Sequence, residues 1–299
     1  MTNYAAVNNK RSEQMAKRRM LDTHLIPYFG RMLLSEIRVR QIEAFKAAQQ
    51  EGGMHGRKLK AKTINNNLAV LSRMLNCAVE WEYLESAPKV RWLKAQRVQM
   101  RFLEFEDADR LLQAAEPGLE RTMMLVALRT GLRIGELLAL RWDDVDLQRR
   151  QVHVRQSSMR GHIDTPKSGR SRIVPMTEEV ERALRGYRHL RGPLVFCNPD
   201  GTHLTDNQTK RHLYRACRKA FLGPFGWHTL RHTFASHLAM RGAPIKAIQE
   251  LLGHATIDMT MRYAHLSPAA KNQAIDLLER GTSVAPEGGA TGKLSTTHG

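Results

Sequence analysis

Two arginines, two histidines and one tyrosine stand out because together they could hold a phosphodiester and attack it. They are Arg133, His228, Arg231, His254 and Tyr263. A phosphodiester is a stable anion, so its cleavage needs a nucleophile, cations for its oxygens and a proton for the leaving oxygen. Arginine suits the second task because its planar guanidinium grips phosphate oxygens and keeps its charge. The set predicts covalent attack on a nucleic-acid backbone, with Tyr263 as the nucleophile.

The spacing of these residues indicates how they could meet. His228 and Arg231 are three residues apart in a segment of helical character, so they share one face of the helix. His254 and Tyr263 are nine residues apart, which one continuous helix would place on opposite sides. We therefore expect Gly253 to end one helix, His254 to lie in a turn and Tyr263 to project from the next helix.

A zinc site is the competing interpretation of the histidines. His228 and His232 have the i, i+4 spacing of a zinc-binding helix, but the residues between them include Arg231 and no HExxH glutamate. An arginine between two ligands would repel a dication, so we expect no metal. His232 is predicted to be a buried, hydrogen-bonded histidine, and His237 and His265 are predicted to have structural roles.

Tyrosine suits reversible chemistry. A phenol with a pKa near 10 is mostly protonated at pH 7. Nearby arginines and a neutral histidine could offset this by favouring the phenolate and accepting its proton. A phosphotyrosine bond keeps the energy of the broken phosphodiester, so a DNA hydroxyl can reseal the strand. We expect no cofactor, neither ATP nor metal.

The first part of the chain is predicted to be helical. Apolar spacing and capping residues predict helices at 9–26, ending before Pro27, at 36–51 with Ser35 as N-cap, and from Thr63 to Trp81. A glycine-rich basic loop at 52–62 separates the last two helices.

The second part is predicted to combine helices with a small sheet. Arg133 follows a glycine turn and begins a helix to Arg141, and Glu136 could orient it from the same face. The alternation at 152–154 and the segment 171–175 indicate two partner strands. Further helices are expected at 105–115, 118–130, from Thr177, and at 205–220, 228–241, 244–252, 256–264 and 269–280.

Both parts of the chain are basic. The 299 residues include 47 Lys and Arg against 29 Asp and Glu, giving a formal net charge of +18 and a pI near 10.3. Residues 1–100 carry +10 of this excess, and residues 101–299 carry +8. Such a distribution is typical of a protein that binds a polyanion along much of its length. A merely alkaline surface is the alternative on charge alone.

The composition argues against several other classes. Cys77, Cys197 and Cys217 form no CxxC pair, which argues against a zinc ribbon or disulfide framework and fits a reducing cytosol. No apolar run approaches the ~20 residues that span a bilayer, and the N-terminus lacks a signal-peptide pattern. We expect a cytoplasmic protein with no membrane partner.

Three strings resemble the tyrosine recombinase (phage integrase) family. They are Thr-Gly-Leu-Arg-Ile-Gly-Glu at 130–136, His-Thr-Leu-Arg-His at 228–232, and Leu-Leu-Gly-His with Tyr-Ala-His inside 251–265. The resemblance implies a mainly α fold with a small β-sheet, in which a helical core-binding domain and a mixed α/β catalytic domain form a C-shaped clamp on DNA. It also implies site-specific recombination through a 3′-phosphotyrosine intermediate, for integration, excision or dimer resolution.

The resemblance extends to individual positions. Lys167 is similar to the family's hairpin lysine, which protonates the departing 5′ oxygen and completes the catalytic set. Neighbouring charges from Arg170 and Arg172 would lower the pKa of Lys167 by repulsion. The residues expected to bind DNA are Arg57, Lys58, Lys60, Lys62, Arg170 and Arg172.

The resemblance also implies an organisation and partners. We expect a core-binding domain at 1–88, a linker at 89–100, a catalytic domain at 101–280 and a disordered tail at 281–299. Double-stranded DNA with a specific site is the expected partner, with a homotetramer on two sites and 269–280 docking on a neighbour. An accessory DNA-bending protein remains open as a further partner. The chain begins almost at the core-binding helix, with no room for an arm-binding domain, so we expect either the Xer or small-integrase kind or an open reading frame shortened at its start.

Two other functions stay open at this point. A type IB-like topoisomerase would nick and reseal DNA without exchanging strands, and relaxation of plasmid lacking a cognate site would reveal it. An inactive relative would bind DNA and form no covalent complex.

Overall fold

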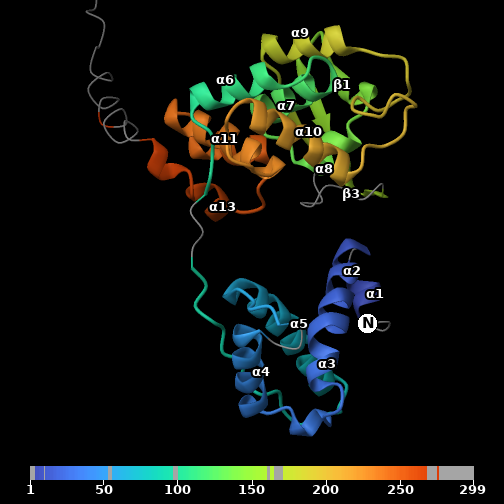
Figure 1. Ribbon diagram of the computed structural model, residues 1–299, viewed down its shortest axis with the longest axis vertical. Helices are drawn as coiled ribbons and strands as arrows, with labels where there is room; N and C mark the ends of the chain where they lie inside the picture. The colour runs from blue at the N-terminus through green and yellow to red at the C-terminus, as the bar shows by residue number, and fades with distance from the viewer. Residues whose placement is uncertain are drawn as a thin grey trace, which may run out of the picture. The chain divides into compact units, whose positions relative to one another are not determined.

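The computed structural model describes residues 4–9, 11–52, 56–96, 100–159, 162–164, 171–267 and 275 (Figure 1). The chain divides into two compact units, Met1–Gln99 and Met100–Gly299. Within the described ranges, no helix is both long and apolar enough to span a membrane.

The first unit is helical. Its elements are α1 (Ala5–Asn8), α2 (Arg11–Met20), a π-helical turn (Leu21–Leu25), α3 (Ile26–Phe29), a 3-10 turn (Leu34–Glu36), α4 (Val39–Glu51) and α5 (Ala61–Glu80). Ile42 and Phe45 of α4 and Leu68 of α5 have no exposed surface and form part of one apolar cluster. Burial of one face of each helix therefore holds this unit together.

Three expected boundaries in this unit are wrong by a few residues. Helical backbone continues past Pro27 to Phe29, because the π turn realigns the chain and proline lies within the first two positions of α3, where its missing N–H costs little. α4 begins at Val39, because Glu36 accepts a hydrogen bond from the Leu33 N–H (2.8 Å) and closes a separate 3-10 turn first. α5 begins at Ala61, so Thr63 lies inside the helix.

Part of the expected linker 89–100 packs onto the first unit. The Asn65 side chain on α5 donates to Leu93 O (2.9 Å) and accepts from Leu93 N (3.0 Å). Lys46 Nζ donates to Arg91 O (3.0 Å), and Val90 and Leu93 contact the apolar cluster. The chain is thus tied to this unit at least as far as Leu93.

The second unit combines helices with two small sheets. Its helices are α6 (Phe105–Ala114), α7 (Leu119–Thr130), α8 (Ile134–Ala139), α9 (Glu178–Tyr187), α10 (Asp206–Lys219), α11 (Trp227–Met240), α12 (Ile245–Leu252) and α13 (Asp258–Met261), with 3-10 turns at Trp142–Asp144 and Ala264–Leu266. Its strands are β1 (Val145–Asp146), β2 (Gln151–Val154), β3 (Ser157–Met159), β4 (His162–Asp164) and β5 (Arg172–Pro175). The predicted fold class, mainly α with a small β-sheet, is confirmed.

The small sheet pairs the two predicted partner strands, with β2 at its centre and β5 at one edge. Its order is β1-β2-β5, with antiparallel pairing throughout. Val152 lies opposite Val174, and both side chains are fully buried. A separate hairpin pairs β3 with β4. The alternation in the sequence therefore identified the buried face of the sheet correctly.

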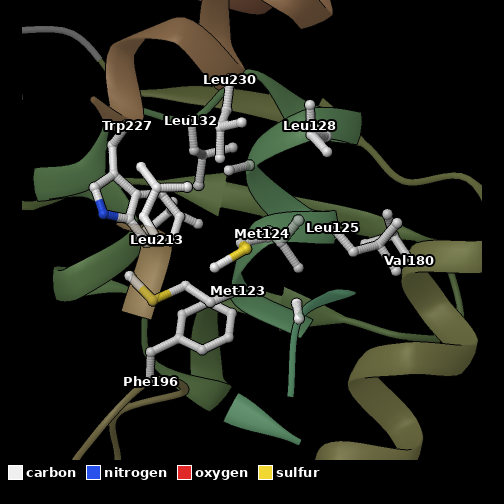
Figure 2. Close-up of a cluster of buried hydrophobic side chains, with 14 of the residues drawn as sticks. Met123, Met124, Leu125, Leu128, Leu132, Val180, Phe196, Leu213, Trp227 and Leu230 are labelled. Carbon is white, nitrogen blue, oxygen red and sulfur yellow. The ribbon is translucent and has the colours of Figure 1, made fainter. Parts of the chain in front are cut away.

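The centre of the second unit is α7. Met123, Met124, Leu125 and Leu128 on this helix are buried among side chains from α9, α10 and α11 (Figure 2). A helix buried on nearly all sides is a fixed support for the residues at its end. α7 ends at Thr130 and is capped by Gly131, whose left-handed backbone (φ +65°) and close approach to the Phe234 ring leave no room for a Cβ.

Candidate active site

Arg231 is buried in the middle of the second unit. It lies on α11, packed against α7, and is only 1% exposed. Its Nη1 donates to Gly131 O and its Nη2 to Leu252 O, both at 2.6 Å. Burial, and next the positive charge of Arg133, lower the pKa of Arg231 to about 9, so it is still a cation at pH 7.

Glu136 organises the arginines from the start of α8. Glu136 is 2% exposed, and its carboxylate accepts from the main-chain N–H and Nη1 of Arg133, both at 2.9 Å. It also accepts from Nη1 and Nη2 of Arg172, at 3.0 and 2.7 Å. Burial alone would raise the pKa of Glu136, but its bonds to Arg172 and Arg133 lower it to about 2. The expected orientation of Arg133 by Glu136 is confirmed.

Arg172 lies in a different environment from the one expected of a DNA-binding residue. Its side chain is 9% exposed, forks onto Glu136 and donates Nε–H to Leu251 O (2.9 Å). β5 brings it there by pairing with β2 and packing beside α12. A guanidinium with these internal acceptors is a structural part of the site and has little surface left for DNA. We call Arg133, Arg172, Arg231 and Glu136 the arginine cluster.

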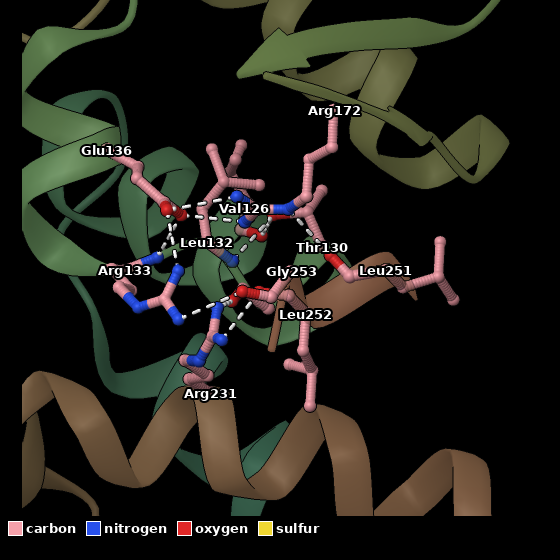
Figure 3. Close-up of polar contacts among 11 residues, drawn as sticks. Val126, Thr130, Leu132, Arg133, Glu136, Arg172, Arg231, Leu251, Leu252 and Gly253 are labelled. Carbon is pink, nitrogen blue, oxygen red and sulfur yellow. Dashed lines mark hydrogen bonds and ion pairs between the residues drawn. The ribbon is translucent and has the colours of Figure 1, made fainter. Parts of the chain in front are cut away.

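The arginine cluster is tied to the end of α12 through three consecutive carbonyl groups. Arg172 donates to Leu251 O, Arg231 to Leu252 O and Arg133, at 3.4 Å, to Gly253 O (Figure 3). The last carbonyls of a helix lack partners within the helix and carry partial negative charge, so cations are favourable there. The same groups that could bind a phosphate therefore also hold the point where the chain turns towards Tyr263.

The chain from Gly253 to Leu266, which we call the tyrosine segment, is short of regular structure. Gly253 is left-handed (φ +63°), and His254 follows in a turn as expected. The predicted helix 256–264 is shorter in the structure, since only α13 and the 3-10 turn Ala264–Leu266 form. Tyr263 lies between them and is 1% exposed.

Tyr263 meets a histidine that sequence reasoning assigned no role in the chemistry. The Tyr263 hydroxyl lies 2.7 Å from His232 Nδ1. Burial, and next the charge of His228, lower the pKa of His232 to about 4, so it is neutral at pH 7 and can accept a hydrogen bond from the phenol. Burial also raises the pKa of Tyr263, against the opposing effect of Arg231 and Arg262.

The other two predicted histidines lie close to this pair. His254 Nδ1 is 2.9 Å from the hydroxyl of buried Thr260, and burial, followed by the charges of Arg231 and Arg133, lowers the pKa of His254 to about 3. The His228 ring meets the His232 ring edge-on, with centroids 4.4 Å apart. Among the described residues, no group of three or more His, Cys, Asp or Glu is placed to hold a metal ion.

The remaining predicted residues fall elsewhere. Lys167 and Arg170 lie outside the described residues. Arg57 and Lys58 are exposed in the loop before α5, Lys60 precedes that helix, and Lys62 is exposed in its first turn. This basic loop belongs to the first unit.

Residues 101–270, which contain all these site residues of the second unit, match the model of the phage integrase family. The chain belongs to the phage integrase family. It is 32% identical over 203 residues to tyrosine recombinase XerC of Thermodesulfovibrio yellowstonii, covering 61% of this chain and 64% of that protein. It is 30% identical over 214 residues to the integrase of Salmonella phage P22, covering 68% of this chain and 53% of that integrase. The chain thus spans less than two thirds of the length of these two relatives.

Solved structures share the fold of this integrase-family chain. The Tn1549 transposon integrase in complex with transposon right end DNA covers 92% of this chain and 96% of its own, with a TM-score of 0.78 at 22% identity. A lambda integrase dimer bound to a COC′ core site covers 88% and 92%, with a TM-score of 0.71 at 19% identity.

Proposed function

We propose that this chain is a site-specific DNA recombinase that cleaves and rejoins strands through Tyr263. The observation that carries the proposal is the charge of the arginine cluster beside a buried tyrosine. Three guanidinium groups face one carboxylate there, so an excess of positive charge is held where little water can screen it. A phosphodiester anion would offset that charge.

The first step is the binding of the scissile phosphate by Arg133 and Arg231. Both have N–H groups beyond those donated to Gly131, Leu252 and Gly253, and the bond from Arg133 to Gly253 O is long at 3.4 Å. A charged phosphate oxygen is a stronger acceptor than a carbonyl, so it competes well for these donors. Because Glu136 and the buried helices hold both arginines, the site needs little reorganisation to stabilise charge in the transition state.

The second step is attack by Tyr263. The Tyr263 hydroxyl gives its proton to a neutral histidine of the proposed catalytic set, and its oxygen forms a bond to phosphorus. The bond from phosphorus to the 5′ oxygen breaks, and the 5′ oxygen takes a proton. We assign that proton to Lys167 on the strength of the sequence resemblance. The 3′-phosphotyrosine bond is then broken by a DNA 5′ hydroxyl, and Tyr263 regains its proton. His228 and His254 complete the proposed catalytic set, and the chemistry consumes no cofactor.

The rest of the chain would serve DNA binding and assembly. We propose that unit Met1–Gln99 is the core-binding domain, with backbone phosphates bound by the basic residues before α5 and in its first turn, Arg57, Lys58, Lys60 and Lys62. Two of the similar structures are integrases in complex with DNA, which supports duplex DNA as the partner. A homotetramer on two DNA sites, acting in the cytoplasm, is the assembly that we expect. The match to the integrase family does not favour a type IB-like topoisomerase or an inactive relative.

The test is a covalent adduct with nicked suicide DNA that carries sequences flanking the gene, incubated in EDTA. We expect an SDS-resistant adduct with the unaltered protein and with Tyr214→Phe, which changes a half-exposed tyrosine on α10. Tyr263→Phe should bind the same DNA and form no adduct. Specific binding without any adduct would favour the inactive relative, and relaxation of plasmid without a site would favour the topoisomerase.

A further inference from the structure

His232 makes the hydrogen bond that fixes the hydroxyl of Tyr263. The distance from Nδ1 to the phenol oxygen is 2.7 Å, which is short for a nitrogen–oxygen pair. The two side chains approach at an angle, with ring centroids 6.0 Å apart, so they meet through these polar atoms and not by stacking. Tyr263 is 1% exposed, and a buried hydroxyl without this partner would have little water to replace it.

The two residues are held by elements of unequal strength. His232 is the sixth residue of α11, a helix of 14 residues. Its sequence neighbours Arg231 and Thr233 are buried. Tyr263 lies between a helix of four residues and a 3-10 turn of three. α11 therefore provides the fixed point, and the His232 bond carries its rigidity to the phenol.

Arg231, which would bind the phosphate, is the residue next to His232 on α11. Successive residues of a helix point about 100° apart. Arg231 accordingly points to Gly131 and Leu252, while His232 points to Tyr263. One rigid stretch of backbone thus sets both the position of the guanidinium that would bind the phosphate and the position of the nucleophile's oxygen. In-line attack depends on that relation, because reacting atoms must lie in a narrow range of distance and angle.

We propose that His232 is a further functional residue of this site, a positioning residue that sets the Tyr263 hydroxyl relative to Arg231. The proposal rests on the recombinase function proposed above. Positioning of Tyr263 requires a hydrogen-bond acceptor at the position of Nδ1, and the neutral imidazole of His232 provides one at neutral pH. Any side chain that places an acceptor there should do much of the same work.

The test is a pair of substitutions of nearly equal shape, His232→Asn and His232→Leu. An asparagine oxygen can occupy the position of Nδ1 and accept a hydrogen bond, whereas leucine cannot. In single-turnover cleavage of suicide DNA, we expect His232→Leu to slow adduct formation roughly tenfold, the factor that one ordinary hydrogen bond represents, without changing DNA affinity. His232→Asn should recover most of the rate. As a control, His212→Leu removes another hydrogen-bonded histidine of this unit, on α10, and should leave the cleavage rate unchanged.

Two results would overturn the proposal. Cleavage by His232→Leu at the unaltered rate would mean that the bond has no part in the reaction. Equal slowing by Asn and Leu would mean that the imidazole acts by accepting a proton, not by positioning. If the unaltered protein forms no adduct on any DNA, it is the recombinase function that fails.

A measurement without DNA keeps the two claims separate. Tyrosine nitration by tetranitromethane, mapped by mass spectrometry, reports how accessible each phenol is. Tyr83, 70% exposed, should react in every variant and serves as the internal standard. Tyr263 should be protected in the unaltered protein and in His232→Asn, and should react several times faster in His232→Leu. Undiminished protection of Tyr263 in His232→Leu would contradict the positioning role.

Discussion

The arginine cluster rests on α8, α11 and β5, where Glu136 and Arg231 are buried and Arg133 keeps part of its side chain exposed. The tyrosine segment, by contrast, contains only seven residues of regular structure, in α13 and one 3-10 turn. The cluster is therefore anchored in the buried interior of its unit through Glu136 and Arg231. The tyrosine segment is held by the bond from Tyr263 to His232 and by packing of Tyr263 and Leu266 in a small apolar cluster, while His254 bonds to Thr260 within the segment. This contrast suggests a division of labour, in which the cations are fixed in advance and the nucleophile is the part that can adjust.

The two regions meet at the end of α12, where the cluster caps the carbonyls of residues 251–253. A phosphate that draws Arg133 or Arg231 away from those carbonyls would loosen the start of the tyrosine segment. Binding of DNA and movement of the start of the tyrosine segment would then be coupled through shared hydrogen bonds. The substitutions below separate the contributions of the two regions.

The largest effect is expected from Arg231→Ala. Removal of a preorganised charge at the reacting phosphate typically costs about 10²–10³ in rate, and this change also frees the Gly131 and Leu252 carbonyls. Single-turnover adduct formation should fall by at least that factor. Arg231→Lys keeps the charge without the fork and should recover only part of it. Arg185→Ala, an exposed arginine on α9, is the control and should be unaffected.

Glu136→Gln should produce the next largest effect, on stability. The buried carboxylate faces two arginines, and breaking such a pair typically costs about 3–5 kcal/mol. The urea concentration at the midpoint of unfolding of the second unit should therefore fall strongly. The matched change Glu178→Gln breaks an exposed pair with Arg150 and should cost less than about 1 kcal/mol. Similar shifts for both variants would mean that the arginine cluster is not held by Glu136.

Gly253→Ala tests the tyrosine segment with a smaller change. A Cβ there would sit 3.0 Å from Arg172 Cδ on a backbone with φ +63°, so a cost of roughly 1–2 kcal/mol is expected. Gly186→Ala, within α9 and with open space around it, should instead stabilise the protein by about 0.5–1 kcal/mol. If the segment is coupled to the cluster, Gly253→Ala should also alter adduct formation, and Gly186→Ala should not.

Acid should weaken the second unit gradually. The pKa values of His254 and His232 lie near 3 and 4 in the folded protein, below the usual value near 6.5, so the unfolded chain binds more protons between these limits. Stability should be independent of these histidines above pH 7 and should fall as pH drops below 6.5. The lowered pKa of Glu136 adds a further loss as pH falls from about 4.5 towards 2. In thermal melts across this range, the melting temperature of His254→Asn should fall less steeply with pH than that of the unaltered protein. An equally steep fall would contradict the lowered pKa of His254.

Local patterns made much of this site predictable from the sequence. Arg133 and Glu136 are three residues apart, so their contact follows from helix geometry. A glycine after a helical pattern predicts a left-handed cap, which Gly253 forms. Arg172 was harder, because its partner Glu136 lies 36 residues away and is reached only through the pairing of β5 with β2. His232 was assigned a structural role because Tyr263, 31 residues away, gives no local signal of contact.

The most direct test of the account is to identify the residue that becomes attached to DNA. After reaction with suicide DNA, nuclease and protease digestion should leave one peptide that carries a nucleotide mass. Fragmentation by mass spectrometry should place that mass on Tyr263. A nucleotide on any other residue, or a phosphate attached through its 5′ end, would contradict the mechanism proposed for this site.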